Sequence, residues 1–462
     1  METYDLVVIG AGPAGTPAAM AASMFGKKVL LIDKRDRPGG ECLFEGCIPS
    51  KVLENAANRY KMLKDASKFH VALKSDPQIH WEEVLRDKEA IIKRRADAAF
   101  IQIEKNPNLE YLHGEAAFED NTHIRVGDEI FAFKKALIAT GGKVSLPPFE
   151  GSGVEKAWTN RDVFFEEKIP KEIIFVGGGA ISCELAGMFN ELGVKCTILE
   201  RGERILKRVD GDAALAVQEK MMKNGIDIEF NVDIDRVDFE NGKFEVAFSQ
   251  SSKKRVLQSE NVLLATGRIA NVDSLGLEKI GVEYDKKGVK VDKFLRTTKE
   301  HIFACGDCID SPKFAHTASY EANIVVHNMF APAPFAVDYD KNSWVLFSDP
   351  EIAIAGIGED EAKKRGLDVE IVKYDYRVDA KAQIDKAELG FVKFVIDKKS
   401  GTIIGVVVLN EDAASLSGEA ALIVANKMNE KAILNAIHPH PTLSEAYGKL
   451  SQQIFFNKMV KR

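Results

Sequence analysis

The sequence predicts an α/β protein in which one strand–glycine turn–helix–strand unit occurs twice, followed by an α+β C-terminal part. Two observations lead to this prediction. The unit begins near residue 5 and again near residue 172, with the same order of apolar, glycine-rich and helical segments. Beyond about Ala336 the pattern changes to apolar segments joined by hairpin signals. A chain of 462 residues has room for two to four domains.

The first unit starts with the apolar strand 5–9 and continues through a helix over 16–25. Its turn contains glycines that would shape the bend, let the backbone approach a pyrophosphate and let the helix pack on the strand. The helix N-terminus would face the phosphates. An acid at the end of the next strand would accept a hydrogen bond from a ribose hydroxyl. These expected cofactor-binding residues are Gly10, Gly12, Gly15 and Asp33.

The second unit follows the same logic, with strand 172–176, a helix over 183–192 and a terminal acid. Its expected binding residues are Gly177, Gly179 and Glu200, and Ser182 stands at the third glycine position. Near-identical strands close the two units, running into Gly141 and Gly267. One glycine motif alone is weak, but two copies in strand–helix context predict two Rossmann-like nucleotide-binding domains.

The C-terminal part contains a hairpin turn at 397–401 between the strand patterns 390–396 and 402–408. Helical patterns at 359–365 and 417–428 flank it, which indicates an antiparallel sheet covered by helices. The predicted domains are a discontinuous first nucleotide-binding domain (1–147 and 268–335), a second (148–267) and an interface domain (336–462).

Cys42 and Cys47 lie five positions apart, just before a helical pattern that starts at Lys51. A ring this small would stabilise the fold by only about 2 kcal/mol before strain. A pair that opens and closes as chemistry is the better interpretation, because a helix N-terminus stabilises a thiolate. The alternative is two buried structural thiols. Cys305 and Cys308 form a C-x-x-C without a second ligand pair at zinc spacing, so we expect packing there and no metal site.

Composition excludes several classes of function. The formal net charge is -7 and basic clusters are short, which argues against nucleic-acid binding. No apolar run is long enough to span a bilayer, so no membrane partner is expected. The N-terminus runs directly into a strand without a charged and then apolar leader, which predicts a cytoplasmic protein.

With these residues in view, the chain resembles the flavoprotein disulfide reductases, and within them the dihydrolipoamide dehydrogenases. The resemblance extends over essentially the whole chain. It implies FAD, NAD, a homodimer with an interface domain, and transfer of electrons from dihydrolipoamide, free or on a lipoyl-bearing carrier protein, to NAD⁺. The matching stretches, in chain order, are 46–51, 302–307, 314–318, 347–353 and 438–445.

The resemblance also assigns roles. Cys42 would be the interchange thiol that forms a mixed disulfide with substrate, and Cys47 the thiolate beside the flavin. His440 would be the base, supplied by the partner subunit, since histidine titrates near neutral pH. Glu445 would orient it, as in other base–orienter pairs.

Four further residues are expected around the cofactors. Lys51 would lie by the flavin, where a cation stabilises the reduced ring, and Glu184 would pair with it near the nicotinamide. Asp307 would hold the ribityl chain, and Ala315 would start the helix beneath the flavin. Glu200 favours NAD over NADP, because a carboxylate repels a 2′-phosphate; Arg201 and Arg204 could partly offset this repulsion.

The sequence departs from the family pattern in places. Ala270 stands where proline is usual, and Glu41 and Glu45 are unusual beside the cysteines. An acid beside a thiolate raises the thiol pKa, so the potential or the substrate could be shifted.

Other functions stay open. The alternatives are an NAD(P)H-dependent reductase of another disulfide or of mercuric ion, and a non-catalytic flavoprotein subunit. Mercuric reductases carry a C-terminal cysteine pair, which residues 453–462 do not contain. Intact cysteines, together with His440 and Glu445, argue against the non-catalytic subunit.

Overall fold

The computed structural model describes residues 3–460 and divides the chain into two compact units. The first comprises the residues up to Pro148, Ala157–Ile169 and Thr266–Val337. The second comprises Phe149–Lys156, Pro170–Ala265 and the residues from Asp338 onward.

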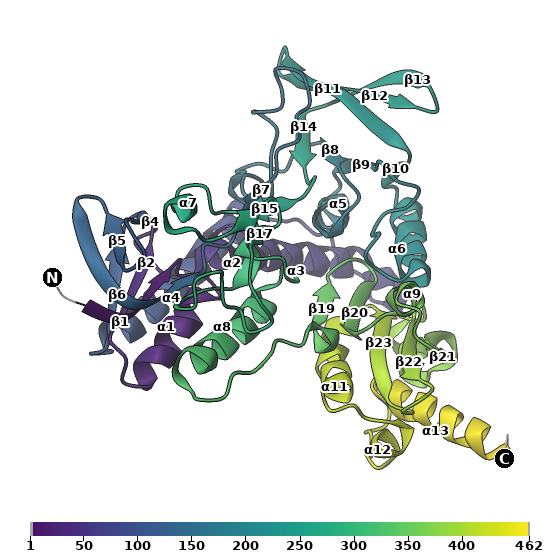
Figure 1. The fold of residues 1–462 in the computed structure, drawn as a ribbon. Coiled ribbons are helices and arrows are strands. Elements are labelled where there is room, and N and C mark those ends of the chain that lie inside the picture. The colour runs from purple at the N-terminus through teal and green to yellow at the C-terminus, as the bar shows by residue number, and fades with distance from the viewer. Residues whose placement is uncertain (1–2, 461–462) are drawn as a thin grey trace. The chain divides into compact units, whose positions relative to one another are not determined.

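A seven-stranded sheet forms the centre of the first unit, in the order β3-β2-β1-β6-β5-β4, with β18 also paired to β6 (Figure 1). Strands β1, β2, β3, β6 and β18 run parallel, and β4 and β5 add antiparallel strands. The central strands are buried on both faces, as continuous apolar runs predict. Their bounds are β1 Thr3–Ile9, β2 Val29–Asp33, β3 Leu109–His113, β4 Ala116–Phe118, β5 His123–Val126, β6 Glu129–Ile138 and β18 Ile302–Ala304.

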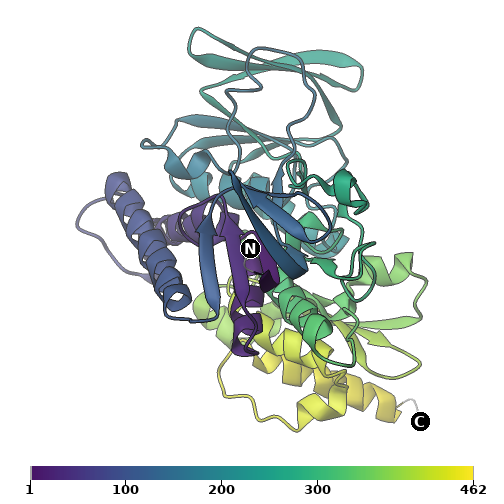
Figure 2. The same cartoon turned by 60° about the vertical axis from the view of Figure 1, so that its left-hand side comes forward.

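Helices of the first unit pair with one another around this sheet. Helix α1 lies beside α8, and α3 beside α4 (Figures 1 and 2). Small residues on α1, such as Ala18 and Ala22, are fully buried, which permits the close approach of helix and strand. The bounds are α1 Gly15–Met24, α2 Gly40–Phe44, α3 Cys47–Lys64, α4 Trp81–Glu104, α7 Leu277–Ile280 and α8 Ala315–Phe330. Two small two-stranded sheets pair β7 (Gly142–Val144) with β15 (Arg268–Ala270) and β16 (Tyr284–Asp285) with β17 (Gly288–Val289).

The second unit contains a four-stranded parallel sheet in the order β10-β9-β8-β14. A three-stranded antiparallel sheet, β11-β12-β13, is a separate sheet in this unit. The bounds are β8 Glu172–Val176, α5 Ala180–Glu191, β9 Lys195–Leu199, α6 Gly211–Lys223, β10 Asp227–Glu229, β11 Val232–Glu240, β12 Lys243–Gln250, β13 Lys253–Ser259 and β14 Asn261–Leu264.

A five-stranded sheet, β19-β20-β23-β22-β21, forms the C-terminal part of the second unit and is antiparallel throughout. The predicted hairpin at 397–401 joins β22 to β23. Phe394 of β22 stacks on Tyr447 of α13 with ring centroids 6.2 Å apart, so this helix covers the sheet. The bounds are β19 Ser343–Leu346, β20 Glu351–Gly356, α9 Glu359–Lys364, β21 Val369–Asp375, α10 Ala380–Asp385, β22 Phe391–Asp397, β23 Ile403–Asn410, α11 Ala413–Ala425, α12 Glu430–Leu434 and α13 Glu445–Val460.

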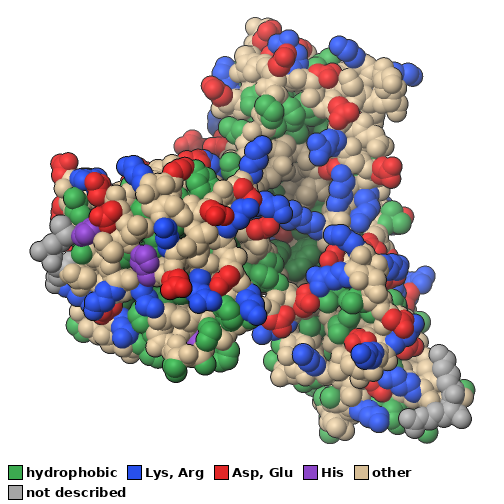
Figure 3. Space-filling view, viewed as in Figure 1, with side chains coloured by type: hydrophobic (Ala, Val, Ile, Leu, Met, Phe, Trp, Pro, Cys, Tyr) green, Lys and Arg blue, Asp and Glu red, His purple; other side chains and the backbone are tan. Residues whose placement is uncertain are grey.

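The fold class is as predicted. Each compact unit contains one Rossmann-like parallel sheet, and the C-terminal part of the second unit is built on an antiparallel sheet. The domain boundaries remain predictions. On the face seen in Figure 3, acidic and basic side chains are interspersed. Among residues 3–460, none of the helices has the length and apolar character needed to cross a bilayer.

Candidate active site

The redox loop, residues 40–47, consists of α2, a two-residue turn and the start of α3. Cys42 lies in α2 and is partly buried, whereas Cys47 is the first residue of α3 and is exposed. The two sulfurs are not joined, and the two side chains are hydrogen-bonded to each other. Gly39 and Gly40 both adopt positive φ angles, 142° and 58°, so the sharp entry into α2 requires glycine.

The hydrogen bond between the cysteines raises the pKa of Cys42 well above its ordinary value, and burial adds to this effect. The start of α3 acts in the opposite direction, because the Cys47 amide donates a hydrogen bond to the Cys42 sulfur and so favours the Cys42 thiolate.

The first glycine turn is closely packed. A Cβ on Gly10 would lie 2.4 Å from the Ala139 carbonyl oxygen, and one on Gly15 would lie 1.7 Å from the Gly10 oxygen. Asp33 closes the turn, because its Oδ2 accepts a hydrogen bond from the Ala11 amide at 2.6 Å. A Cβ on Gly12 would meet only Gly40, at 3.6 Å.

A nucleotide fits this first turn. Helix α1 starts at Gly15 without a side-chain cap, so the positive end of its dipole can face a phosphate. Thr140 Oγ1 is buried at the end of β6 and has no hydrogen-bond partner among the described residues. A bound FAD would give such a hydroxyl a partner.

The second glycine turn repeats this geometry around Glu200. Its carboxylate accepts hydrogen bonds from the amides of Gly178 at 2.7 Å and Gly202 at 2.6 Å. Lys207 Nζ lies 3.1 Å from the same carboxylate. A Cβ on Gly179 would meet nothing within 4 Å, and α5 carries no side-chain cap. This arrangement fits a second nucleotide. The open space at the uncapped start of α5 suits a pyrophosphate, and the oriented acid suits a ribose hydroxyl.

Three further side chains lie near this turn in the sequence and differ in their burial and hydrogen bonds. Ser182 is fully buried, and its hydroxyl has no partner among residues 3–460. Arg204 donates to the carbonyls of Leu206 and Val209 at 2.9 and 3.2 Å, so its charge is used to hold this loop. Arg201 is exposed.

The two closing strands of the repeat lead into segments that meet. Gly141 and Gly267 have φ angles of 70° and 134°, and the strands that follow them, β7 and β15, pair antiparallel. Asp307 lies in a 3-10 turn, Gly306–Cys308, and burial raises its pKa. Its Oδ2 lies 3.7 Å from Arg268 Nε. Ala315 is the first residue of α8, which has no side-chain cap.

His440 and Glu445 lie together in the second unit. Nδ1 of His440 is 3.1 Å from both carboxylate oxygens of Glu445, and the His440 side chain is 70% exposed. The Thr442 amide donates to Glu445 Oε2 at 3.1 Å. Burial alone would raise the pKa of Glu445, but this amide, His440 and Lys449 together hold it below its ordinary value. A carboxylate on Nδ1 leaves Nε2 as the free acceptor, which is the geometry a base needs.

Lys51 and Glu184 lie in different units, and their pairing stays a prediction. Within the first unit, Lys51 forms an ion pair with Glu54 at 2.5 Å. Within the second, Glu184 Oε1 accepts a hydrogen bond from the Phe347 amide at 3.0 Å, which links α5 to the C-terminal part.

Cys305 and Cys308 are fully buried in the core of the first unit, and Cys308 Sγ donates to the carbonyls of Cys305 and Ile138. This environment is that of two side chains packed in the hydrophobic core, as expected from the sequence. No group of three or more His, Cys, Asp or Glu side chains suited to a metal ion occurs within the described part of the chain.

Four polar residues next to the redox loop were missed by the sequence interpretation: Arg35, Asn160, Arg161 and Arg268. They contact Glu41 and Glu45, whose charges are therefore balanced. Arg268 directly follows Gly267, but nothing local to that motif identifies its partner.

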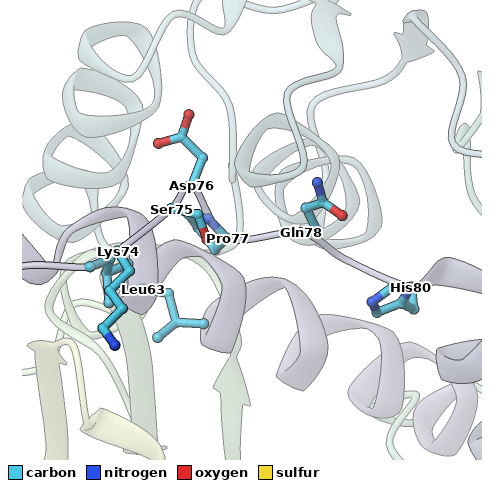
Figure 4. Close-up of a pocket in the computed structure, with 8 residues that line it drawn as sticks. Leu63, Lys74, Ser75, Asp76, Pro77, Gln78 and His80 are labelled. Carbon is cyan, nitrogen blue, oxygen red and sulfur yellow. The ribbon is translucent and has the colours of Figure 1, made fainter.

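A surface hollow of about 620 Å³ lies where the connection to α4 passes the end of α3 (Figure 4). It contains none of the predicted site residues. Its lining is Leu63, Leu73, Lys74, Ser75, Asp76, Pro77, Gln78 and His80.

Comparisons with known proteins agree with this geometry. Residues 4–322 match the pyridine nucleotide-disulphide oxidoreductase family, and residues 342–451 match the dimerisation domain of that family. The chain is 33% identical to a dihydrolipoyl dehydrogenase of Bacillus subtilis (strain 168), covering 96% of this chain and 94% of the relative. It is 34% identical to a dihydrolipoyl dehydrogenase of Geobacillus stearothermophilus, with the same coverage.

More distant proteins also match almost the whole of this chain. A mercuric reductase of Lysinibacillus sphaericus is 29% identical, covering 96% of this chain and 81% of that protein. The structure of the HOCl-induced flavoprotein disulfide reductase RclA from Escherichia coli superposes with a TM-score of 0.86 at 25% identity, over 98% of this chain and 100% of that one. The chain therefore belongs to the pyridine nucleotide-disulphide oxidoreductase family, as an FAD- and pyridine nucleotide-dependent enzyme with a Cys-x4-Cys redox pair.

Proposed function

We propose that this enzyme oxidises dihydrolipoamide to lipoamide and reduces NAD⁺ to NADH. The observation that supports the proposal most directly is the hydrogen-bonded pair of Cys42 and Cys47 at the uncapped start of α3. Relatives that are 33–34% identical over almost the whole chain carry the same assigned activity.

The thiol chemistry takes Cys42 as the interchange thiol and Cys47 as the thiolate beside the flavin, as the family resemblance implies. In the oxidised enzyme a substrate thiolate attacks Cys42, the Cys42–Cys47 bond breaks, and Cys47 leaves as the thiolate. The second substrate thiol gives its proton to His440 and attacks the substrate sulfur held on Cys42. Lipoamide is released and Cys42 takes up a proton. Glu445 stabilises the charged imidazole that forms.

Bound FAD would carry the electron pair from the dithiol to the nicotinamide. The residues that would hold it are Gly10, Gly12, Gly15, Asp33, Gly141, Asp307 and Ala315, with Lys51 near the ring. The residues that would hold the nicotinamide nucleotide are Gly177, Gly179, Glu184, Glu200 and Gly267. The acid at Glu200, oriented by two amides, supports NAD over NADP.

The family's dimerisation domain supports a homodimer in which His440 serves the redox pair of the other subunit. The lipoyl group would come from a separate carrier protein or from free dihydrolipoamide. A cytoplasmic location is part of the same proposal.

One comparison tests the substrate. Purified enzyme is assayed for NAD⁺ reduction with dihydrolipoamide, for NADPH oxidation with glutathione disulfide, and for NADPH oxidation with mercuric chloride. We expect the first activity to exceed the others by orders of magnitude. Turnover with only glutathione disulfide or mercuric ion would replace the proposed substrate by that acceptor.

A further inference from the structure

Two acids occupy the redox loop, Glu41 directly before Cys42 and Glu45 two residues before Cys47. Both are largely buried, with side chains 20% and 18% exposed. A carboxylate withdrawn from water needs a counter-charge or hydrogen bonds. Both acids have cationic partners in the structure, and Arg161 is shared between them.

Glu41 forms a two-pronged ion pair with Arg268. Nη1 of Arg268 donates to Oε1 at 2.7 Å and Nη2 donates to Oε2 at 2.5 Å. Such parallel bonds fix orientation as well as distance. Burial would raise the pKa of Glu41, but Arg268, Arg161 and Asn160 together outweigh it and hold the pKa below its ordinary value. Glu41 is therefore ionised at neutral pH.

Glu45 has a different main partner and shares Arg161 with Glu41. Its carboxylate pairs with Arg35 and lies 3.1 Å from Arg161 Nε, which is 3.7 Å from Glu41 Oε1. Asn160 Nδ2 donates to the Glu45 carbonyl at 3.2 Å and approaches Glu41 Oε1 at 3.3 Å. No ion pair joins Glu45 to Arg268 among the described residues. The two acids of one loop can therefore be compared as a matched pair.

Arg268 also lies close to the redox pair. Its guanidinium, 21% exposed, pairs with Glu41 and lies 3.7 Å from Asp307. Glu41 is adjacent to Cys42 and packs against the residue before Cys47, since a Cβ on Gly46 would lie 3.1 Å from the Glu41 carbonyl oxygen. A charge on Cys47 therefore acts on Arg268. Arg95 of α4 acts on Cys42 in the same way. The charged groups around the dithiol are the acids Glu41, Glu45 and Asp307 and the cations Arg35, Arg95, Arg161 and Arg268. Without Glu41, the cation of Arg268 would be compensated only by Asp307 and Cys47.

We propose that Glu41 is a positioning residue that occupies the Arg268 guanidinium, holding the redox loop on β15 and withholding that positive charge from the Cys47 thiolate. The proposal rests on the proposed function only in taking Cys47 as the thiolate of the reduced pair. Reduction of the disulfide takes two electrons and one proton and yields the Cys42 thiol and the Cys47 thiolate. A cation released toward Cys47 would stabilise that product and make the pair more oxidising.

The test measures the thiols directly. Reduced holoenzyme is alkylated with iodoacetamide between pH 5 and 9 under anaerobic conditions, and modified Cys47 is quantified by peptide mass spectrometry. The variants are Glu41→Gln, Glu45→Gln, Arg268→Met and the double variant Glu41→Gln/Arg268→Met. We expect Glu41→Gln to lower the midpoint of Cys47 alkylation by about one pH unit, and Arg268→Met to raise it by a similar amount. The double variant should return close to wild type, and Glu45→Gln should shift the midpoint far less than Glu41→Gln.

An equal shift in Glu41→Gln and Glu45→Gln would show a general effect of acid removal and overturn the proposal, as would an unmoved midpoint in Glu41→Gln. If Arg268→Met does not fold, the comparison of Glu41→Gln with Glu45→Gln still tests the proposal. A second readout is the midpoint potential of the dithiol in a glutathione redox buffer, which should become more positive in Glu41→Gln. Neither readout uses dihydrolipoamide, so failure of the proposed substrate leaves this result interpretable.

Discussion

Nζ of Lys393 lies 2.8 Å from Oδ2 of Asp210, and neither side chain is more than 5% exposed. The same ammonium lies 2.9 Å from Asp212 and 3.1 Å from Glu359. Asp210 also accepts hydrogen bonds from the backbone amides of Glu359 and Asp360. This buried cluster joins the nucleotide-binding part of the second unit to its C-terminal sheet, across segments that are distant in sequence.

Removing the cation should destabilise this unit strongly. Lys393→Met leaves three carboxylates without their shared counter-charge, and loss of one partner from a buried ion pair costs about 3–5 kcal/mol. The control is Lys373→Met, since Lys373 pairs with Asp212 at 2.6 Å but is 41% exposed, where such pairs contribute about 0–1 kcal/mol. Urea unfolding followed by circular dichroism measures both. Equal losses in the two variants would contradict a special role for the buried cluster.

The cluster also predicts how stability depends on pH. Burial tends to raise the pKa of Asp212 and of Glu359, but their lysine partners outweigh it and hold both below their ordinary values. Their contribution is therefore present above the unfolded pKa, near 4, and is lost as pH falls below it. Urea midpoints measured from pH 7 to pH 3 should fall steeply at the acid end. Lys393→Met should flatten that fall, and an unchanged acid slope would show that other carboxylates dominate it.

Cys47→Ser should abolish turnover of dihydrolipoamide with NAD⁺, because the disulfide can no longer form. The matched control is Cys196→Ala, which removes a buried thiol from β9 in the second unit, whereas the redox loop belongs to the first. Titration of wild-type enzyme with NADH should produce a long-wavelength thiolate–flavin band that the Cys47→Ser variant lacks. Full turnover in Cys47→Ser would mean that electrons follow another route.

His440→Gln should slow dihydrolipoamide oxidation by about 10²- to 10⁴-fold, the usual contribution of a positioned general base. Glu445→Gln should slow it less, since the imidazole remains but loses the carboxylate on Nδ1. NADH oxidation with ferricyanide needs no thiol base and should stay near the wild-type rate in both variants. Equal losses in the two assays would point to damage of the fold instead.

Glu200 should decide the choice of nicotinamide nucleotide. Its carboxylate is oriented by the amides of Gly178 and Gly202, and Glu200→Gln removes its charge while keeping its size. We expect the ratio of kcat/KM for NADH over NADPH to fall about ten- to hundredfold, the value of one charged hydrogen bond and the lost repulsion. Glu203→Gln, at an exposed position of the same loop, is the control. An unchanged ratio would mean that residues other than Glu200 determine the preference between NADH and NADPH.

Local patterns in the sequence determined much of this protein. The glycine turns, the strands that lead into them and the hairpin at 397–401 all follow from short-range rules of backbone conformation and burial, and the structure contains them. The pairing of His440 with Glu445 is also local, because both lie within one turn that leads into α13. The spacing of Cys42 and Cys47 identified a redox pair at the start of a helix for the same reason.

Only the tertiary structure decided which charges meet. Arg268 reaches Glu41 from 227 positions away, because the pairing of β15 with β7 brings it beside the redox loop. Lys393 meets Asp210 because β22 and the segment before α6 belong to one packed unit. An ion pair depends on where the chain folds back and not on local propensity, so an acid beside a cysteine shows its electrostatic effect only once its partner is known.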